Sequence, residues 1–213
     1  METKTIPDEL FEDVRSVFKA DSTGHDYYHT LRVYRTAVNL ALLENADPYV
    51  TGLGALLHDV DDFKQSNGQL TGFDRASLIM GRYGIDQPSR EHVKKIIQMV
   101  VLDESRDHSL DTIEGWCVLD AIRLDESGAI GIARAFALGG RADRAIYDPL
   151  LKPRTRNGTN GSNSTTSVNY FYEKLLKLEG KMTTPSGKRI ASHRHTFLEQ
   201  YLEEFFAEWS GEL

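Results

Sequence analysis

The sequence contains one cysteine, Cys117, and no hydrophobic run long enough to span a membrane. A single cysteine excludes an intrachain disulfide framework and a cysteine-rich zinc site. A transmembrane helix needs roughly 18 consecutive apolar residues, and the N-terminal segment METKTIPDELFEDV also lacks the apolar core of a signal peptide. We therefore expect a cytoplasmic protein with no membrane partner.

An excess of positive charge is also absent. The 213 residues carry 25 Lys and Arg against 32 Asp and Glu, a formal net charge of -7. Because nucleic acids and anionic membranes are bound through clustered Lys and Arg, no broad nucleic-acid surface is expected, and any phosphate must be bound locally. The length and the 40% hydrophobic content suit one sizeable core, so we expect a single domain over residues 1–213. These features leave the oligomeric state open.

Strand-like alternation of apolar and polar residues is rare in the chain, whereas the helical period recurs throughout. Asp47-Pro48 is a favourable helix start, since the Asp side chain can accept from a free N–H and Pro needs no donor there. Gly84, Gly139-Gly140 and Gly180 are candidate helix ends. We predict an all-α fold with helices crossing around a central cleft. The predicted helices cover residues 8–19, 27–44, 48–58, 72–83, 89–101, 111–121, 128–137, 168–179 and 186–209.

The segment 153–167 is poor in apolar residues and rich in turn formers. Such a segment cannot bury enough surface to offset the entropy of ordering, so we predict a mobile polar loop within the domain. A lid over the cleft is the functional alternative. The three Asn-x-Ser/Thr patterns in this segment are attributed to its composition, because no secretory signal accompanies them.

The dipeptide His58-Asp59 closes the apolar run LGALL. An imidazole beside a carboxylate, at the edge of core-forming residues, is costly to bury unless something binds both side chains. Two further histidines, His25 and His29, are four residues apart and would share one face of a helix. Asp120 also follows an apolar run, where a solvated carboxylate is unexpected. Two of these histidines and the two carboxylates, brought together from different helices, would form an octahedral metal site with two positions left for water.

Helix geometry limits where the doublet can bind an ion. Adjacent residues on a helix point about 100° apart, so His58 and Asp59 reach one ion only where the helix ends, and the segment VDDFKQSNG supplies that ending. Other roles stay open for each residue taken singly. Either histidine could be a hydrogen-bonded core residue, and Asp120 could cap a helix.

Four longer segments extend this pattern: GHDYYHTLRVYRTA, ALLHDVDDFK, LDAIRLDESGAIGIARAFALGG and NYFYEKLLKLEGKMTTPSGKRIA. They resemble successive blocks of the HD-domain phosphohydrolases, in particular the small single-domain YpgQ-like group, and the resemblance extends over roughly residues 22–205. The resemblance implies an HD-domain helical fold with the metal site in a central cleft. It also implies the metal ligands His29, His58, Asp59 and Asp120.

Charged residues beside these ligands are candidates for catalysis and substrate binding. His25 could protonate a leaving group, orient the site or merely cap a turn. Asp62 could act as the base that helps deprotonate the attacking water, or it could be a solvated charge. Candidate phosphate contacts are three basic residues near the ligand segments, each of which could instead form a structural ion pair: Arg32, Lys64 and Arg123.

These residues together predict metal-assisted hydrolysis of a phosphate ester or anhydride. Mixed imidazole and carboxylate ligation suits one divalent manganese, iron, cobalt or nickel ion, with zinc or magnesium as alternatives. The resemblance implies a small phosphorylated nucleotide as substrate, and pyrophosphate release from a nucleoside or deoxynucleoside triphosphate is the favoured reaction. Hydrolysis of a nucleoside monophosphate or of a guanosine tetraphosphate-like alarmone is the alternative. A nucleotide-sensing or partner-binding module with little activity is another.

The chain departs from this branch at two positions. Relatives usually have Asp-Ala-Asp-Arg-Leu-Asp where this chain has Asp-Ala-Ile-Arg-Leu-Asp, so Ile122 replaces an acid. Val100 stands where relatives usually have a histidine, and His92, two helical turns earlier, is no obvious replacement. Both changes leave the expected ligands intact, but they put substrate choice and turnover rate in doubt.

Overall fold

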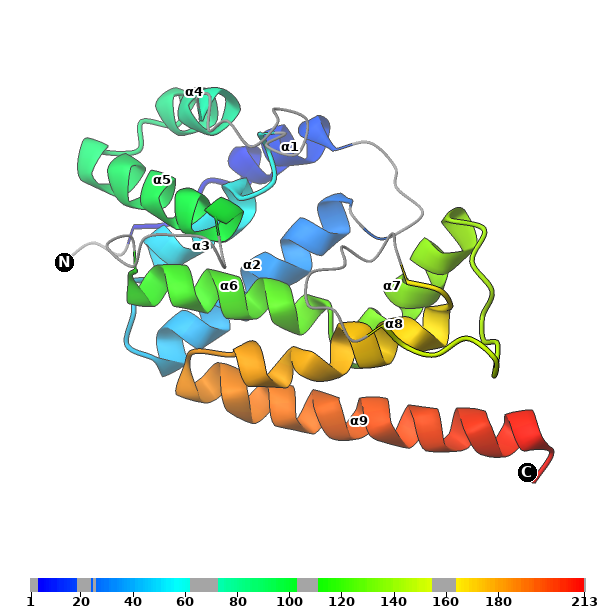
Figure 1. The fold of residues 1–213 in the computed structure, drawn as a ribbon. Helices are drawn as coiled ribbons and strands as arrows, with labels where there is room; N and C mark the ends of the chain where they lie inside the picture. The colour runs from blue at the N-terminus through cyan, green and yellow to red at the C-terminus, as the bar shows by residue number, and fades with distance from the viewer. Residues whose placement is uncertain are drawn as a thin grey trace. The chain divides into compact units, whose positions relative to one another are not determined.

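The computed structural model describes residues 4–18, 24, 26–61, 73–102, 111–154 and 164–212. Within these ranges, β pairing is limited to one isolated parallel bridge between Ala145 and Thr166. The expectation of an all-α fold is therefore confirmed (Figure 1). The helices are α1 (Asp8–Val17), α2 (Tyr27–Leu43), α3 (Pro48–Leu57), α4 (Asp74–Arg82), α5 (Gln87–Leu102), α6 (Ile113–Asp125), α7 (Gly128–Arg141), α8 (Ser167–Glu173), η4 (Leu175–Lys177), η5 (Glu179–Lys181) and α9 (Pro185–Ser210).

Each range predicted from the hydrophobic period overlaps one α-helix, and the differences lie at the ends. The range 168–179 breaks after Glu173 into the short 3-10 helices η4 and η5. Gly139-Gly140 does not end a helix, because α7 continues to Arg141. A Cβ atom on Gly139 would lie 2.0 Å from the Ser167 hydroxyl, so this glycine permits close contact between α7 and α8.

The chain divides into two compact units, residues 1–20 with 25–122 and residues 21–24 with 123–213. The boundary falls within α6, and the expectation of a single domain stays a prediction.

In the first unit, α3 packs against both α2 and α5. Every residue of α3 from Val50 to Leu57 is buried, as expected for a helix that is apolar on all sides. Gly52 and Gly54 admit Tyr34 of α2 and Ile96 of α5 close to the α3 backbone.

The second unit is built around the long helix α9, which packs against α7 and carries Tyr201 against Phe171 of α8. The two rings stack with centroids 5.6 Å apart. The helix begins at the cap Thr184 with Pro185 and ends at Gly211, whose φ of 74° permits a left-handed C-cap. Although α9 has 26 residues, neither it nor any other helix in the described ranges is both long and apolar enough to cross a bilayer.

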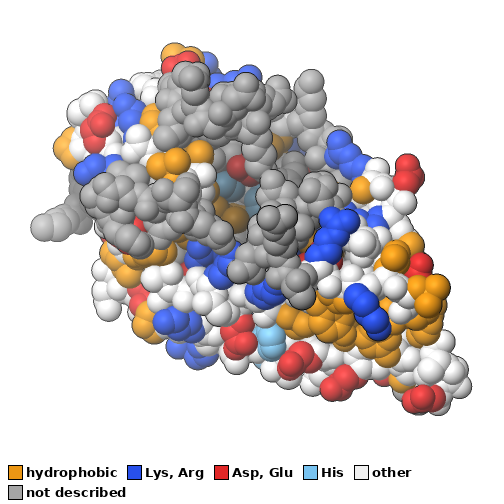
Figure 2. Space-filling view, viewed as in Figure 1, with side chains coloured by type: hydrophobic (Ala, Val, Ile, Leu, Met, Phe, Trp, Pro, Cys, Tyr) orange, Lys and Arg blue, Asp and Glu red, His pale blue; other side chains and the backbone are white. Residues whose placement is uncertain are grey.

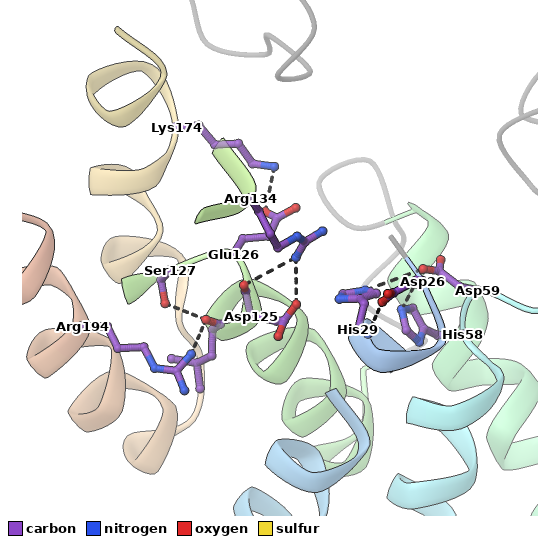
Figure 3. A network of polar contacts seen from close by, with 11 residues as sticks. Asp26, His29, His58, Asp59, Asp125, Glu126, Ser127, Arg134, Lys174 and Arg194 are labelled. Carbon is purple, nitrogen blue, oxygen red and sulfur yellow. Dashed lines mark hydrogen bonds and ion pairs between the residues drawn. The ribbon is translucent and has the colours of Figure 1, made fainter. Parts of the chain in front are cut away.

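The C-terminal end of α6, also in this unit, is held by polar contacts (Figure 3). Ser127 Oγ and the Arg194 guanidinium both donate to the Leu124 carbonyl. The Asp125 carboxylate is buried and lies 2.8 Å from Nη1 of Arg134. Because the last carbonyls of a helix have no partner within that helix, these contacts stabilise the turn into α7.

Most of the predicted polar loop, residues 155–163, lies outside the described residues, so its mobility stays a prediction. The chain on either side of it is anchored to α8. The buried Glu173 carboxylate accepts from the Arg154 backbone N–H at 2.8 Å and from Ser164 Oγ at 2.5 Å. The Thr166 side chain caps α8 by accepting from the Asn169 N–H.

Candidate metal centre

The doublet His58-Asp59 lies where α3 ends. Asp47 caps the start of α3, as the sequence predicts, and its carboxylate accepts from the N–H groups of Tyr49 and Val50. The helix stops at Leu57, and His58 is its C-cap residue. Because the chain leaves the helix here, the two side chains converge, and Nε2 of His58 lies 3.2 Å from Oδ2 of Asp59. The doublet therefore lies at a helix end, as the sequence predicts.

The turn that carries Asp59 is fixed by a long-range cap. Asp61 accepts hydrogen bonds from the N–H groups of Arg75 and Ala76, at 2.9 and 3.1 Å. Both groups belong to the first turn of α4, whose own preceding residue, Phe73, provides no side-chain cap. A carboxylate at a helix N-terminus is favourable for the hydrogen bonds and for the helix dipole. Asp61 thereby ties the turn after α3 to α4.

His29 enters the site from the first turn of α2. Asp26 caps this helix, and its carboxylate accepts from the backbone N–H of His29 at 3.0 Å. The imidazole is buried, its Nε2 lies 3.8 Å from Oδ2 of Asp59, and its ring centroid lies 5.6 Å from that of His58 (Figure 3). His29 therefore approaches the same carboxylate oxygen as His58, from a different helix.

The Ala55 carbonyl fixes the orientation of the His58 ring. Nδ1 of His58 lies 2.7 Å from this carbonyl oxygen. A carbonyl oxygen can only accept, so Nδ1 donates, and in the neutral ring Nε2 carries the lone pair. That lone pair faces the Asp59 carboxylate oxygen 3.2 Å away. Two acceptors at such a distance repel each other unless a proton or a cation lies between them.

The donor set fits a divalent metal ion. One ligand atom from each of His29, His58 and Asp59 lies within 4.8 Å of the other two. Both histidines are buried, whereas 29% of the Asp59 side chain is exposed, so the cluster retains contact with solvent. Imidazole with carboxylate is a typical donor set for first-row transition metals. The backbone carbonyl behind His58 is the kind of outer partner that orients a metal-binding histidine.

The structure brings three of the four expected ligands together. Asp120 is fully buried on α6, but it is not one of the three residues that form the cluster. Its place as a fourth ligand stays a prediction. Its carboxylate contributes to raising the pKa of the neighbouring Cys117 thiol.

The other candidate residues have different outcomes. His25, Asp62 and Lys64 lie outside the described residues. Arg32 is half-buried on α2. Arg123 is buried, and its Nη1 donates to the Lys181 carbonyl, which gives it a structural contact.

The two positions that depart from the family pattern, Val100 and Ile122, are both partly exposed. His92, which was no obvious replacement for the histidine absent at Val100, contacts Glu114, and its Nε2 lies 3.3 Å from Oε2 of Glu114. Glu114 also accepts from the backbone N–H of Asp47 at the start of α3. His92 therefore belongs to a polar contact at the N-terminal end of α3, whereas the candidate ligands lie at its C-terminal end.

Asp26 and Asp61 support this site, although sequence reasoning did not single them out. Asp26 precedes a helical period and matches the signal of an N-cap, so a cap could have been predicted. The contact of Asp61 with α4 has no such signal in the sequence. It joins residues 14 and 15 positions apart, across a segment without a clear helical period.

The comparisons with known proteins agree with this geometry. A family model described as the HD domain matches residues 26–125. The crystal structure of an HD-superfamily hydrolase from Bacillus thuringiensis is similar over 95% of this chain and 95% of its own, with 37% identity and a TM-score of 0.75. The chain belongs to the HD-domain superfamily.

Bacillus subtilis YpgQ is a second relative of this HD-domain protein. Its crystal structure in complex with ADP has 31% identity and a TM-score of 0.74, and the match covers 94% of this chain and 96% of that one. A structure from Lactobacillus plantarum has 29% identity and a TM-score of 0.73, and the match covers 97% of this chain and 100% of that one. Both matches extend well beyond the segment 26–125 that carries the expected ligands.

Proposed function

We propose that this HD-domain protein is a metal-dependent phosphohydrolase of a phosphorylated nucleotide. Pyrophosphate release from a nucleoside or deoxynucleoside triphosphate is the favoured reaction. The observation that carries the proposal is the cluster of His29, His58 and Asp59, whose ligand atoms lie within 4.8 Å of one another. The crystal structure of YpgQ in complex with ADP supports a nucleotide as the ligand of this chain as well.

In this proposal, His29, His58 and Asp59 hold one divalent cation, and Asp120 is the fourth ligand. Such a cation polarises a phosphoryl oxygen and increases the acidity of a water molecule. Two neutral imidazoles and two carboxylates would balance its charge of +2. Manganese, iron, cobalt or nickel suits this donor set, with zinc or magnesium as alternatives.

The protein's own contribution is a prearranged set of donors. The Ala55 carbonyl keeps the Nε2 lone pair of His58 directed at the site, and the Asp26 cap fixes the turn from which His29 projects. Asp61 fixes the turn that carries Asp59. Because these contacts hold the donors in place, little reorganisation is needed when charge develops during hydrolysis.

Proton transfer and substrate binding are assigned to the remaining candidates. Asp62 is proposed as the base that accepts a proton from the attacking water, and His25 as the group that protonates the leaving group. The basic residues Arg32, Lys64 and Arg123 are proposed to bind the phosphates. For Arg123 this role adds to its bond with the Lys181 carbonyl.

The test is an assay of the purified protein with manganese and a panel of nucleoside tri-, di- and monophosphates. Release of pyrophosphate and of phosphate is measured separately. We expect pyrophosphate release from triphosphates, and a loss of at least about a hundredfold in His58→Gln and Asp59→Asn, because mutation of a mere outer partner of a metal ligand already costs about 10–100-fold. His193→Gln is the matched control, since His193 is exposed on α9, and it should retain full activity.

Three results would change the assignment. Nucleotide binding without turnover, in protein that holds its metal, would favour the nucleotide-sensing alternative. Phosphate release from a monophosphate or from an alarmone, without pyrophosphate from triphosphates, would favour the alternative substrates. Full activity in both site variants would show that the cluster is not the catalytic centre.

A further inference from the structure

The second unit contains a buried arginine, Arg134 on α7, to which the proposed reaction assigns no role. Only 12% of its side chain is exposed, whereas many Lys and Arg side chains are spread over the surface (Figure 2). Its Nη1 lies 2.8 Å from Oδ2 of the buried Asp125 and also donates to the Asp125 backbone carbonyl at 3.5 Å (Figure 3). Because charges are costly to bury, a buried ion pair is weak evidence for a role in stability alone.

The aliphatic part of the Arg134 side chain packs against Gly24. A Cβ atom on Gly24 would lie 3.1 Å from Cγ and 3.5 Å from Cδ of Arg134. Gly24 also has a φ of 77°, a backbone conformation that residues with a side chain rarely adopt. The backbone conformation and the close approach of the arginine therefore both favour glycine at position 24.

Along the chain, Gly24 leads directly to the metal centre. It ends the short segment 21–24 of the second unit, and the chain enters the first unit at the next residue. Two residues after Gly24, Asp26 caps α2, and its carboxylate accepts from the backbone N–H of His29. Since planar peptide units leave only two soft dihedral angles per residue, a contact that fixes Gly24 also restricts the turn that carries His29.

We propose that Arg134 is a positioning residue for the metal centre. The Asp125 carboxylate holds the guanidinium, the aliphatic chain of Arg134 fixes the backbone of Gly24, and Gly24 restricts the cap from which His29 projects. In this role the arginine needs no contact with the metal or the substrate. The inference rests on the part of the proposed function that places a cation at His29.

A second glycine and arginine of the same kind provide the matched control. Gly128, at the start of α7, has a φ of 63°, and a Cβ atom there would lie 3.1 Å from Cγ of Arg194. The Arg194 guanidinium is also held at the end of α6, where it donates to the Leu124 carbonyl. The local arrangement is therefore similar, but Gly128 leads into α7, which carries none of the expected metal ligands.

The first test is a manganese titration of the full chain, with the free energy of unfolding measured in parallel. Gly24→Ala and Gly128→Ala should lose similar stability, because each places a side chain at a positive φ and against an arginine. Only Gly24→Ala should weaken manganese binding, by about tenfold, the lower end of the cost of losing an outer partner of a metal ligand. Wild-type affinity in Gly24→Ala would overturn the proposal, and so would an equal loss of affinity in both variants.

Variants of the arginine give a second test. Arg134→Met combined with Asp125→Asn removes both charges, so no unpaired ion is left buried. This double variant should bind manganese more weakly than the wild type, whereas Arg134→Lys, which keeps a cation and an aliphatic chain, should retain most of the affinity. Arg194→Met is the control and should leave the affinity unchanged. Wild-type affinity in the double variant would overturn the proposal, and so would a loss in Arg134→Lys as large as in the double variant.

Both tests measure manganese affinity without a nucleotide, so their result does not depend on which reaction the protein catalyses. A wild-type chain that binds no manganese would overturn the proposed metal centre and this inference with it. Manganese binding that is insensitive to Gly24→Ala and to the double variant would overturn the inference alone.

Discussion

Nε2 of His58 lies 3.2 Å from Oδ2 of Asp59, although the two residues are neighbours in the sequence. Within a continuous helix their side chains would point about 100° apart. They meet because α3 ends at Leu57 and because the Ala55 carbonyl orients the imidazole. His29 then adds a second ring beside the same carboxylate oxygen. The site therefore depends on how two helices end as much as on the identity of its residues.

The orientation of His58 predicts its tautomer. Because Nδ1 donates to the Ala55 carbonyl, the neutral ring should carry its proton on Nδ1 and its lone pair on Nε2. Nitrogen NMR of the metal-free protein, with histidine selectively labelled, distinguishes the two forms. His193, exposed on α9, provides the unconstrained reference. A neutral His58 protonated on Nε2 would contradict this arrangement.

Removal of the Asp26 side chain should affect both stability and metal binding. Asp26→Ala deletes the cap of α2, which costs about 1 kcal/mol in the free energy of unfolding. The lost bond is the one to His29, so the affinity for manganese should also fall. Urea denaturation and a metal titration measure the two effects.

Asp47→Ala is the comparison for this variant, because Asp47 caps α3 at the end remote from His58. It should cost a similar amount of stability with a smaller loss of metal affinity. Equal losses of affinity in the two variants would mean that the Asp26 cap has no specific effect on the site.

Much of the fold was predictable because it depends on local patterns. Asp47-Pro48 signals the start of α3, and the apolar run up to Leu57 leads directly to the doublet, so His58 and Asp59 stood out. The pairing of His29 with them also followed, through the family pattern. The link from Asp61 to α4 was not predictable, because hydrophobic periodicity carries no information on which distant helix a carboxylate will cap. Gly139 was misjudged for a similar reason, since its role is contact with Ser167 of another helix.

Two glycines should respond to alanine in opposite ways. A Cβ atom on Gly54 would lie 2.8 Å from Cγ2 of Ile96, in the contact between α3 and α5. Gly54→Ala should therefore cost about 1–3 kcal/mol by overpacking. Nothing lies within 4 Å of a Cβ on Gly140 in α7, so Gly140→Ala should gain about 0.5 kcal/mol through chain entropy. Urea denaturation of both variants checks the signs, and a loss at Gly140 equal to that at Gly54 would refute the packing argument.

Cys117 should make the protein less stable at alkaline pH. Burial, with help from the Glu44 and Asp120 carboxylates, raises the pKa of its thiol from 9.0 to about 12. Between these two values the unfolded chain has lost the thiol proton, whereas the folded chain keeps it. The free energy of unfolding therefore falls as pH rises through this window. In Cys117→Ala the fall should be smaller, and an identical pH dependence in the two proteins would contradict the assignment.

The most direct test of the metal centre is the metal content of the purified protein. The chain is equilibrated with manganese, dialysed, and analysed by elemental mass spectrometry, with circular dichroism as the check on folding. The wild type and His193→Gln should retain one ion per chain, whereas His58→Gln and Asp59→Asn should retain almost none while remaining folded. Retention of one ion per chain by both site variants would contradict the assignment of the metal to this cluster.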